Sequence, residues 1–401
     1  MQSAEIYKRE IDLVRFAIET YGFQVNKKKS SKRQIVLHSA QDKIIISRNP
    51  EGQYWYFNPA NSKDKGTIID FVLHRNQNNQ EETWEVLEQY IKQTEKYPDS
   101  IEIPAQPQTH TFSYSPLSDS YYLEKRGISI RTIFSPEFNQ RIFNHIHTIG
   151  AKQFVNTAFP LYLNKKIVGL ELKNTHYHGY APGSMKSLGL WVSNFEHLKP
   201  DHSVKWVITE SGVDCLSFHQ LFPPDNTEKR VYISTGGVIT KGQLDEIQHL
   251  VSKFSDSSII LANDKDLAGV KQNIQILGQI ELNQKSKRFK CWISQDENNT
   301  SLLYIEITKG EHDLIFESNT MAKLFSKDQQ LEVSEENITI QRNDNIAILE
   351  IPLSTKMIAL ERLETIIPAI RGIKKLIKVQ KPKNKDFNDD LIQSFQKNPN
   401  T

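Results

Sequence analysis

The sequence predicts an α/β fold inside a chain that is α+β overall, and its central element is a parallel sheet. Residues 204–277 alternate short apolar strands with helical patterns, an order typical of parallel sheets. Two of these strands run directly into acidic residues and then turn at a glycine into a helix. The length of 401 residues indicates two to four domains. We therefore expect a parallel sheet accompanied by smaller domains.

Composition excludes several classes of protein. Hydrophobic residues make up 38% and charged residues 24% of the chain, which is typical of globular proteins. No apolar run is long enough for a membrane span or a signal peptide, so we expect a cytoplasmic protein without a membrane partner. Cys215 and Cys291 are too few for a disulfide framework or a Cys-rich zinc site, and both are expected to be reduced core residues.

A net charge of +2 means that any surface for nucleic acid must be a local basic patch. The candidate patches are Lys27-Lys28-Lys29 with Lys32-Arg33, and the series Lys374, Lys375, Lys378, Lys381, Lys383 and Lys385.

The first 96 residues are predicted to form a small α+β module. An amphipathic helix is expected over residues 4–22, followed by three strands and two helices. The strands are Gln34–His38, Lys43–Arg48 and Gln53–Phe57. The next helix is expected to begin at Gly66, and the last one to cover Glu81–Lys96. The aromatic run Tyr54-Trp55-Tyr56-Phe57 has two interpretations, which are base stacking and a small hydrophobic core.

The middle of the chain begins with a linker. Residues 97–118 contain four prolines among Ser, Thr and Gln, a composition typical of linkers. Residues 119–200 contain three notable segments, Tyr121–Ile128, Ala158-Phe159-Pro160 and Ile167–Asn174. The small-residue loop Gly179–Lys186 carries one lysine and is either an approach to a triphosphate or an ordinary surface loop.

Carboxylates follow two strands of the predicted parallel sheet. Glu210 ends one strand, and Asp264 and Asp266 end another. The carboxyl ends of parallel strands line the ligand crevice, so we expect these three side chains to lie close together. Carboxylates at such short range repel unless a cation neutralises them, and hard oxygen ligands suit Mg²⁺ or Mn²⁺. The alternative for Asp-x-Asp is a solvated turn or a helix N-cap.

The order strand-Glu210-x-Gly212-helix, then strand-Asp264-x-Asp266-x-Ala268-Gly269-helix, resembles the Toprim family. Toprim is the metal-binding catalytic domain of bacterial-type primases, topoisomerases and some nucleases, and the second motif is similar to its primase version. The resemblance implies a Rossmann-like parallel sheet with Glu210, Asp264 and Asp266 as catalytic and metal-binding residues. Gly212 is expected to let the backbone turn closely behind the site, and Gly269 to start a packed helix.

A further metal ligand is implied near the end of the chain. Primases carry a Lys-Asp-x-Asp loop after the last Toprim strand, and Lys385-Asp386-Phe387-Asn388 matches it with Asn388 in place of the second acid. Asp386 is therefore expected to join the metal site, and its alternative role is a helix N-cap. This interpretation assigns residues 201–285 and 371–396 to Toprim, with 286–370 as a β-rich insertion.

Two upstream segments also resemble primases. Residues 1–96 are similar to the primase zinc-binding domain, but they contain no Cys and only His38 and His74, so we predict a zinc-free module. Residues 119–200 resemble the subdomain that precedes Toprim in primase cores. The resemblance implies nucleotide or DNA contacts by Arg126, Lys173, Lys186 and Lys265. At Lys173 the family has an arginine, so bidentate phosphate geometry is lost.

The leading hypothesis is therefore a primase-like nucleotidyltransferase that makes short oligonucleotides on single-stranded DNA with Mg²⁺ or Mn²⁺. The alternatives are a Toprim nuclease and a non-catalytic protein that binds single-stranded DNA. The combination of modules looks like plasmid or mobile-element proteins. It implies nucleoside triphosphates, single-stranded DNA, and replication or conjugation proteins as partners.

Overall fold

The structure is a computed structural model. It describes residues 7–8, 11–26, 30, 34–39, 42–48, 53–76, 79–94, 112–149, 152–295, 301–308, 314–343, 345–354 and 356–397. The basic runs at 27–29 and 32–33, and residues 97–111 of the expected linker, lie outside these residues. The chain divides into two compact units, residues 1–109 and 110–401, and each unit is described by itself.

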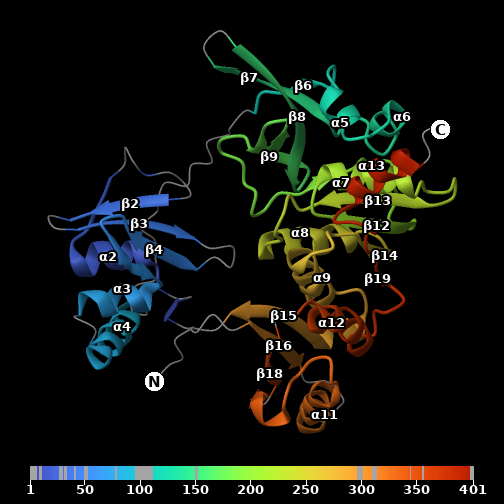
Figure 1. Ribbon diagram of the computed structural model, residues 1–401. Helices are drawn as coiled ribbons and strands as arrows, with labels where there is room; N and C mark the ends of the chain where they lie inside the picture. The colour runs from blue at the N-terminus through green and yellow to red at the C-terminus, as the bar shows by residue number, and fades with distance from the viewer. Residues whose placement is uncertain are drawn as a thin grey trace. The chain divides into compact units, whose positions relative to one another are not determined.

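The first unit is an antiparallel sheet with helices packed against it (Figure 1). The strand order is β1-β2-β3-β4-β5, with β1 at Gln24–Val25, β2 at Gln34–His38, β3 at Lys43–Arg48, β4 at Tyr54–Asn58 and β5 at Asn61–Gly66. The helices are α2 (Leu13–Tyr21), α3 (Ile68–Arg75) and α4 (Gln80–Thr94). Helix α2 begins where the Asp12 carboxylate accepts two backbone N–H groups, and it ends at Gly22, whose φ is +67°.

Strand β4 sends its aromatic side chains to opposite faces, as the period of two in a strand requires. Tyr56 is fully buried in the core of the unit, and Tyr54 packs against that core. Trp55 and Phe57 are 45% and 39% exposed. The hydrophobic-core interpretation therefore holds for the two tyrosines, and base stacking stays a prediction for Trp55 and Phe57.

An ion-pair network ties this sheet to α3. The Arg75 guanidinium lies 2.5 Å from Asp42 Oδ2 and 3.3 Å from Asp64 Oδ1, and it stacks over the Phe71 ring at 3.8 Å. The Tyr56 hydroxyl donates to Asp64 at 2.6 Å. Charge and hydrogen bonds thus cross-link β5, α3 and the residue before β3. The absence of zinc from this module stays a prediction.

The second unit contains the predicted parallel sheet. Its strand order is β11-β13-β12-β14-β19, with β11 at Trp191–Val192, β12 at Ser203–Thr209, β13 at Lys229–Ser234, β14 at Asp256–Leu261 and β19 at Ile377–Val379. All neighbours are parallel except β11 and β13. The helices α7 (Gly212–Leu221), α8 (Lys241–Val251) and α9 (Leu267–Gln279) each follow one of these strands. The α/β fold with a parallel sheet is confirmed.

An antiparallel sheet and two short helices precede the parallel sheet. The strand order is β10-β9-β8-β7-β6, with β6 at Ser115–Pro116, β7 at Phe143–Ile149, β8 at Lys152–Leu163, β9 at Lys166–Lys173 and β10 at His178–Tyr180. The helices are α5 (Tyr121–Lys125) and α6 (Ile130–Ile133). Phe159 and Leu161 of β8 share a core with Val207 and Tyr232 of the parallel sheet. The upstream sheet therefore packs directly on the parallel one.

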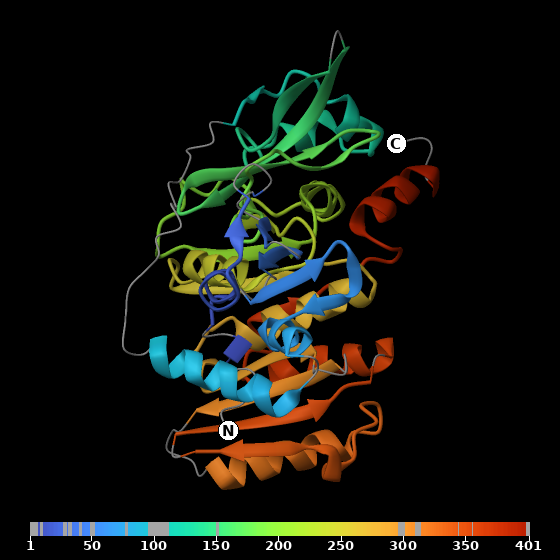
Figure 2. The same ribbon diagram turned by 90° about the vertical axis from the view of Figure 1, so that its left-hand side faces the viewer.

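A second antiparallel sheet lies between β14 and β19 in the sequence. Its order is β15-β16-β18-β17, with β15 at Phe289–Gln295, β16 at Ser301–Thr308, β17 at Thr339–Arg342 and β18 at Ile346–Pro352; Figure 2 shows these strands in orange. The associated helices are α10 (Gln284–Arg288), α11 (Leu314–Lys327) and α12 (Met357–Ile370), and α13 (Phe387–Lys397) follows β19. The neighbours β14 and β19 are thus separated in the sequence by this sheet, and the insertion at 286–370 stays a prediction.

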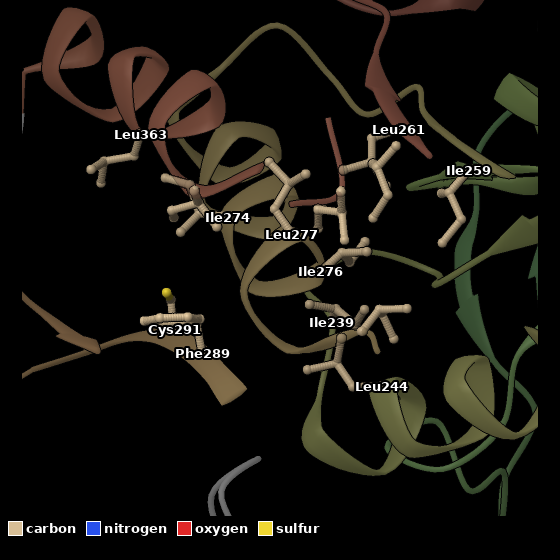
Figure 3. Close-up of a cluster of buried hydrophobic side chains, with 14 of the residues drawn as sticks. Ile239, Leu244, Ile259, Leu261, Ile274, Ile276, Leu277, Phe289, Cys291 and Leu363 are labelled. Atoms are coloured by element: carbon tan, nitrogen blue, oxygen red, sulfur yellow. The ribbon is translucent and has the colours of Figure 1, made fainter. Parts of the chain in front are cut away.

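The inserted strands share the core of the parallel sheet. Phe289 and Cys291 of β15 belong to the same buried cluster as Ile274 and Leu277 of α9 (Figure 3). At Gly278, a Cβ would lie 2.0 Å from the carbonyl oxygen of Cys291, so α9 and β15 are in backbone contact. Both cysteines are free and buried, as expected. Within the described residues, no helix has the length and apolarity needed to cross a membrane.

Candidate metal centre

The ends of β12 and β14 place two acidic loops at one edge of the sheet. The strands pair in parallel with Ile208 opposite Leu261, and the Ala262 N–H donates to the Ile208 carbonyl at 2.8 Å. Glu210 lies two residues beyond Ile208, and Asp264 lies two residues beyond Ala262. The shared register therefore carries both carboxylates to the same carboxyl-terminal edge.

These carboxylates act on one another electrostatically. Burial, followed by the charges of Asp214, Glu210, Asp386 and Asp266, raises the pKa of Asp264 to about 8. Burial and the charges of Asp266 and Asp214 likewise raise the pKa of Glu210 to about 7. The charges of the other three acids predicted for the metal site therefore all act on Asp264.

Asp214 is a fifth carboxylate of the cluster that sequence reasoning missed. Burial and the charge of Asp386 raise its pKa to about 6. It lies in the first turn of α7, where Ser211 caps the helix and donates to its carboxylate at 2.5 Å. The sequence does indicate this position, because Asp214 comes four residues after Glu210. A residue there lies on the first turn of the helix, which starts close to the end of the strand.

The chemistry of these side chains fits a hard divalent cation. Glu210 Oε1 is buried and has no hydrogen-bond partner among the described residues. A buried carboxylate oxygen without a partner is costly, and a cation would satisfy it while relieving the repulsion around Asp264. Carboxylate oxygens are the ligands that Mg²⁺ and Mn²⁺ prefer.

The side chains are not gathered at ligand distance. Over the described ranges, no three His, Cys, Asp or Glu residues form a group that could hold a metal ion. Asp266 caps α9 by accepting the Gly269 N–H at 2.9 Å, and Asp386 caps α13 by accepting the Asp389 N–H at 2.7 Å. The helix-cap alternatives are thus realised for both residues. Each cap uses the Oδ1 atom, so it leaves Oδ2 for a cation.

The two predicted glycines lie where a side chain would not fit. A Cβ at Gly269 would lie 2.2 Å from the Asp264 carbonyl oxygen, so α9 packs tightly against the acidic loop. A Cβ at Gly212 would lie 2.5 Å from the Phe159 ring, so the start of α7 packs against the upstream sheet. Close approach requires glycine at both positions, since neither has a positive φ.

Lysines surround the acidic edge. The Lys265 N–H donates to the Lys385 carbonyl at 2.8 Å, and Lys265 Nζ donates to the Lys383 carbonyl at 3.2 Å. The charge of Lys385 lowers the pKa of Glu210, which partly offsets the rise from burial. Lys186 Nζ donates to the Val238 carbonyl at 3.4 Å, and the N–H of the preceding Gly237 donates to the Glu210 carbonyl at 2.9 Å.

Lys173 and Arg126 occupy more enclosed positions than the sequence indicated. Lys173 is 6% exposed, and its Nζ lies 3.2 Å from the fully buried Glu171, with Asp214 also acting on its charge. It therefore lies inside the protein beside the acidic cluster. Arg126 ends α5, and its Nε is buried without a hydrogen-bond partner in the described part of the chain. Nucleotide or DNA contact by these residues stays a prediction.

Asn388, which replaces an acid of the primase loop, has a structural position. Its N–H donates to Asp214 Oδ1 at 3.3 Å, and its side-chain amide donates to Ser217 Oγ at 3.0 Å and the Arg126 carbonyl at 2.8 Å. The residue thus links α13, α7 and α5 beneath the acidic edge.

Comparison with known families identifies the domain that carries this edge. Residues 207–300 match a family described as Toprim-like. The chain therefore contains a Toprim-like domain. The match includes Glu210, Asp214, Asp264 and Asp266, and it indicates a metal-dependent function on nucleic acids, with Mg²⁺ as the metal that Toprim domains bind. It does not include the upstream sheet or the first unit, and no curated protein matches the chain.

Proposed function

We propose that the protein is a primase-like nucleotidyltransferase, which joins nucleoside triphosphates into short oligonucleotides on single-stranded DNA. The observation that carries the proposal is the cluster of mutually repelling carboxylates at the edge of a Toprim-like sheet, with Glu210 Oε1 unsatisfied. In this proposal Glu210, Asp264, Asp266 and Asp386, with Asp214, hold Mg²⁺ or Mn²⁺. The metal would supply charge neutralisation for displacement at phosphorus.

The side chains around the cluster support substrates that carry phosphate. Lys265, Lys383 and Lys385 are exposed and belong to two loops that are hydrogen-bonded to each other next to the acids. A rim of this kind attracts the phosphates that the carboxylates alone would repel. The rim therefore supports a nucleotide or nucleic-acid substrate over a small neutral one.

The first unit supports single-stranded DNA as the template. Trp55 and Phe57 are exposed on one face of its sheet, and Phe57 pairs with exposed Lys65 on the neighbouring strand. Lys43 and Lys63 are also exposed. Aromatic side chains that stack on bases, beside lysines that contact the backbone, bind single strands without sequence preference. The process served would be replication or transfer of a plasmid or mobile element, with the proteins of that process as partners.

One observation favours the non-catalytic alternative. Asp266 and Asp386 cap helices, and the carboxylates of the described residues are not arranged at ligand distance. A protein that uses these acids only as caps would bind single-stranded DNA without turnover.

A gel assay separates the candidates. The full chain is incubated with single-stranded DNA and Mg²⁺ or Mn²⁺, with and without ribo- and deoxyribonucleoside triphosphates. We expect new short oligonucleotides only when nucleotides are present. Shortened DNA would instead identify a nuclease, and bound but unchanged DNA would identify a non-catalytic binder.

A further inference from the structure

A chain of buried amide and carboxylate side chains lies beneath the acidic edge. Asn263, Gln272 and Asn273 are each 2–3% exposed, and Glu364 is 7% exposed. Asn263 Nδ2 donates to Asn273 Oδ1 at 2.7 Å, and Asn273 Nδ2 donates to Glu364 Oε1 at 2.8 Å. Gln272 Nε2 donates to Asn263 Oδ1 at 2.9 Å. Each link joins a donor to an acceptor, so the chain has a defined direction.

The inner end of this chain holds the loops that carry the carboxylates. Asn263 directly precedes Asp264. Gln272 Nε2 also donates to Thr235 Oγ1 at 3.0 Å, and the Thr235 N–H donates to the Thr209 carbonyl at 3.2 Å. The hydrogen bonds therefore connect the loops after β14 and β13 to the end of β12, which Glu210 directly follows.

The outer end lies on α12, beyond the inserted sheet. Glu364 Oε2 is 2.8 Å from Lys381 Nζ, which also lies 2.7 Å from Glu361 Oε1. Lys381 follows β19, and the three side chains line an open groove of about 500 Å³. Glu361 and Glu364 thus share one lysine, but only Glu364 continues inward to Asn273.

We propose that Asn273 and Glu364 are positioning residues for the metal centre, acting through Asn263 on Asp264. This inference rests on the proposed function, because it assumes that Asp264 and Glu210 bind a divalent cation. The carboxylates of the acidic loops repel one another, so hydrogen bonds to the protein interior are needed to hold the loops in place. A buried and fully paired chain provides such a restraint, whereas surface loops alone do not.

The direction of the chain provides a reciprocal test. Asn273→Asp places a carboxylate oxygen against Glu364 Oε1, so the link between them is lost. Adding Glu364→Gln restores every pair, because the new amide donates to the new carboxylate and still accepts from Lys381. The double variant has the same total charge as the unmodified protein. Glu361→Gln is the matched control. Glu361 lies on the same helix as Glu364 and contacts the same lysine, but it is not part of the hydrogen-bonded chain.

The measurement is Mn²⁺ affinity of the full chain, followed by electron paramagnetic resonance, with circular dichroism to verify folding. We expect Asn273→Asp to weaken Mn²⁺ binding by about 10- to 100-fold, the range for residues that orient metal ligands. The double variant is expected to return close to the unmodified affinity, and Glu361→Gln to keep it.

Three results would overturn the inference. The first is unchanged Mn²⁺ affinity in folded Asn273→Asp. The second is a double variant that folds normally but binds as weakly as Asn273→Asp. The third is an Asn273→Asp variant that fails to fold, together with a double variant that folds but does not recover Mn²⁺ binding. That result would give the Asn273–Glu364 pair a structural role only. If the unmodified protein does not bind Mn²⁺, the proposed function fails, and this inference fails with it.

Discussion

Substituting Asp264 and Asp266 together separates their proposed role in metal binding from their effect on the fold. Asn at position 266 can still cap α9, since Asn and Asp are equally good N-caps, so the fold is expected to hold. Neutral amides cannot hold a divalent cation against its hydration. Asp264→Asn with Asp266→Asn is therefore expected to abolish metal-dependent activity in the gel assay.

The same double variant should keep its affinity for single-stranded DNA or gain slightly, because the lost charges only repelled phosphates. Fluorescence anisotropy with a labelled oligonucleotide measures this. Retained activity in the double variant would exclude the acidic edge as its source.

The raised pKa values predict how stability depends on pH in metal-free protein. Unfolded Asp and Glu titrate near pH 4, whereas Glu210 and Asp264 in the folded state have pKa values of about 7 and about 8. Between these limits the folded state binds more protons than the unfolded state. The free energy of unfolding is therefore expected to fall as pH rises from about 4 to 8.

Urea unfolding in EDTA at pH 5, 6, 7 and 8 measures this slope. Asp264→Asn should flatten it, and Mg²⁺ should restore stability at pH 8, where the ionised carboxylates bind the cation. A metal-free protein whose stability rises through this range would contradict the assignment of the cluster.

Lys173 is expected to matter for folding because it is buried beside Glu171. Lys173→Met leaves the Glu171 charge in the interior without its ammonium partner, which should cost about 3–5 kcal/mol of unfolding free energy. The control is Lys356→Met, which breaks an exposed pair with Glu332 and should cost less than about 1 kcal/mol. Equal losses of unfolding free energy in urea titrations of both variants would show that the buried Lys173–Glu171 pair contributes no more to stability than an exposed pair.

Residue-level prediction succeeded where position in a strand decides the outcome. Apolar runs that end in Glu210 and Asp264 were enough to place both acids at one sheet edge. The sequence did not indicate the burial of Lys173, because a partner decides it. Lys173 carries a charge typical of a surface, but Glu171 lies two residues earlier on the same strand face and pairs with it.

Helix α9 is packed against the acidic loop so closely that its first turn tolerates no side chain at Gly269. Gly269→Ala would place a Cβ 2.2 Å from the Asp264 carbonyl, so the loop must shift. We expect a loss of stability of about 1–3 kcal/mol and weaker Mn²⁺ binding. The control is Ala268→Ser at the exposed neighbouring position, which should change neither. Unfolding and Mn²⁺ titrations test both, and normal Mn²⁺ affinity in Gly269→Ala would contradict this account.

At the scale of elements, strong apolar patterns were sufficient and weak ones were not. The strands and helices of the parallel sheet follow from runs such as Val204–Thr209, where burial reinforces strand propensity. Strand β5 was not predicted, because Asn61–Gly66 contains no apolar residue. It forms because β4 supplies its backbone partners and Arg75 pairs with its buried Asp64. Such tertiary stabilisation leaves no periodic signal in the sequence.

The division into two units predicts two unfolding transitions for the whole molecule. Residues 110–401 share continuous cores and should unfold together, whereas residues 1–109 have a core of their own. Mg²⁺ should raise the midpoint of only the larger transition, because the proposed metal centre lies in the second unit. Differential scanning calorimetry with Mg²⁺ and with EDTA tests this. A single transition, or equal shifts in both, would contradict it.

The pairing of β14 with β19 has a consequence for the order in which the protein is made. Ile259 pairs with Ile377, so 118 residues separate two neighbours in the sheet. At about 5–20 residues per second, a ribosome takes roughly 6–24 s to reach β19 after completing β14. During that interval one edge of β14 has unpaired backbone groups, which is a hazard for association between nascent chains. The strands β15 to β18 are synthesised in the same interval. They can pack against α9 before β19 is available to pair with the open edge of β14.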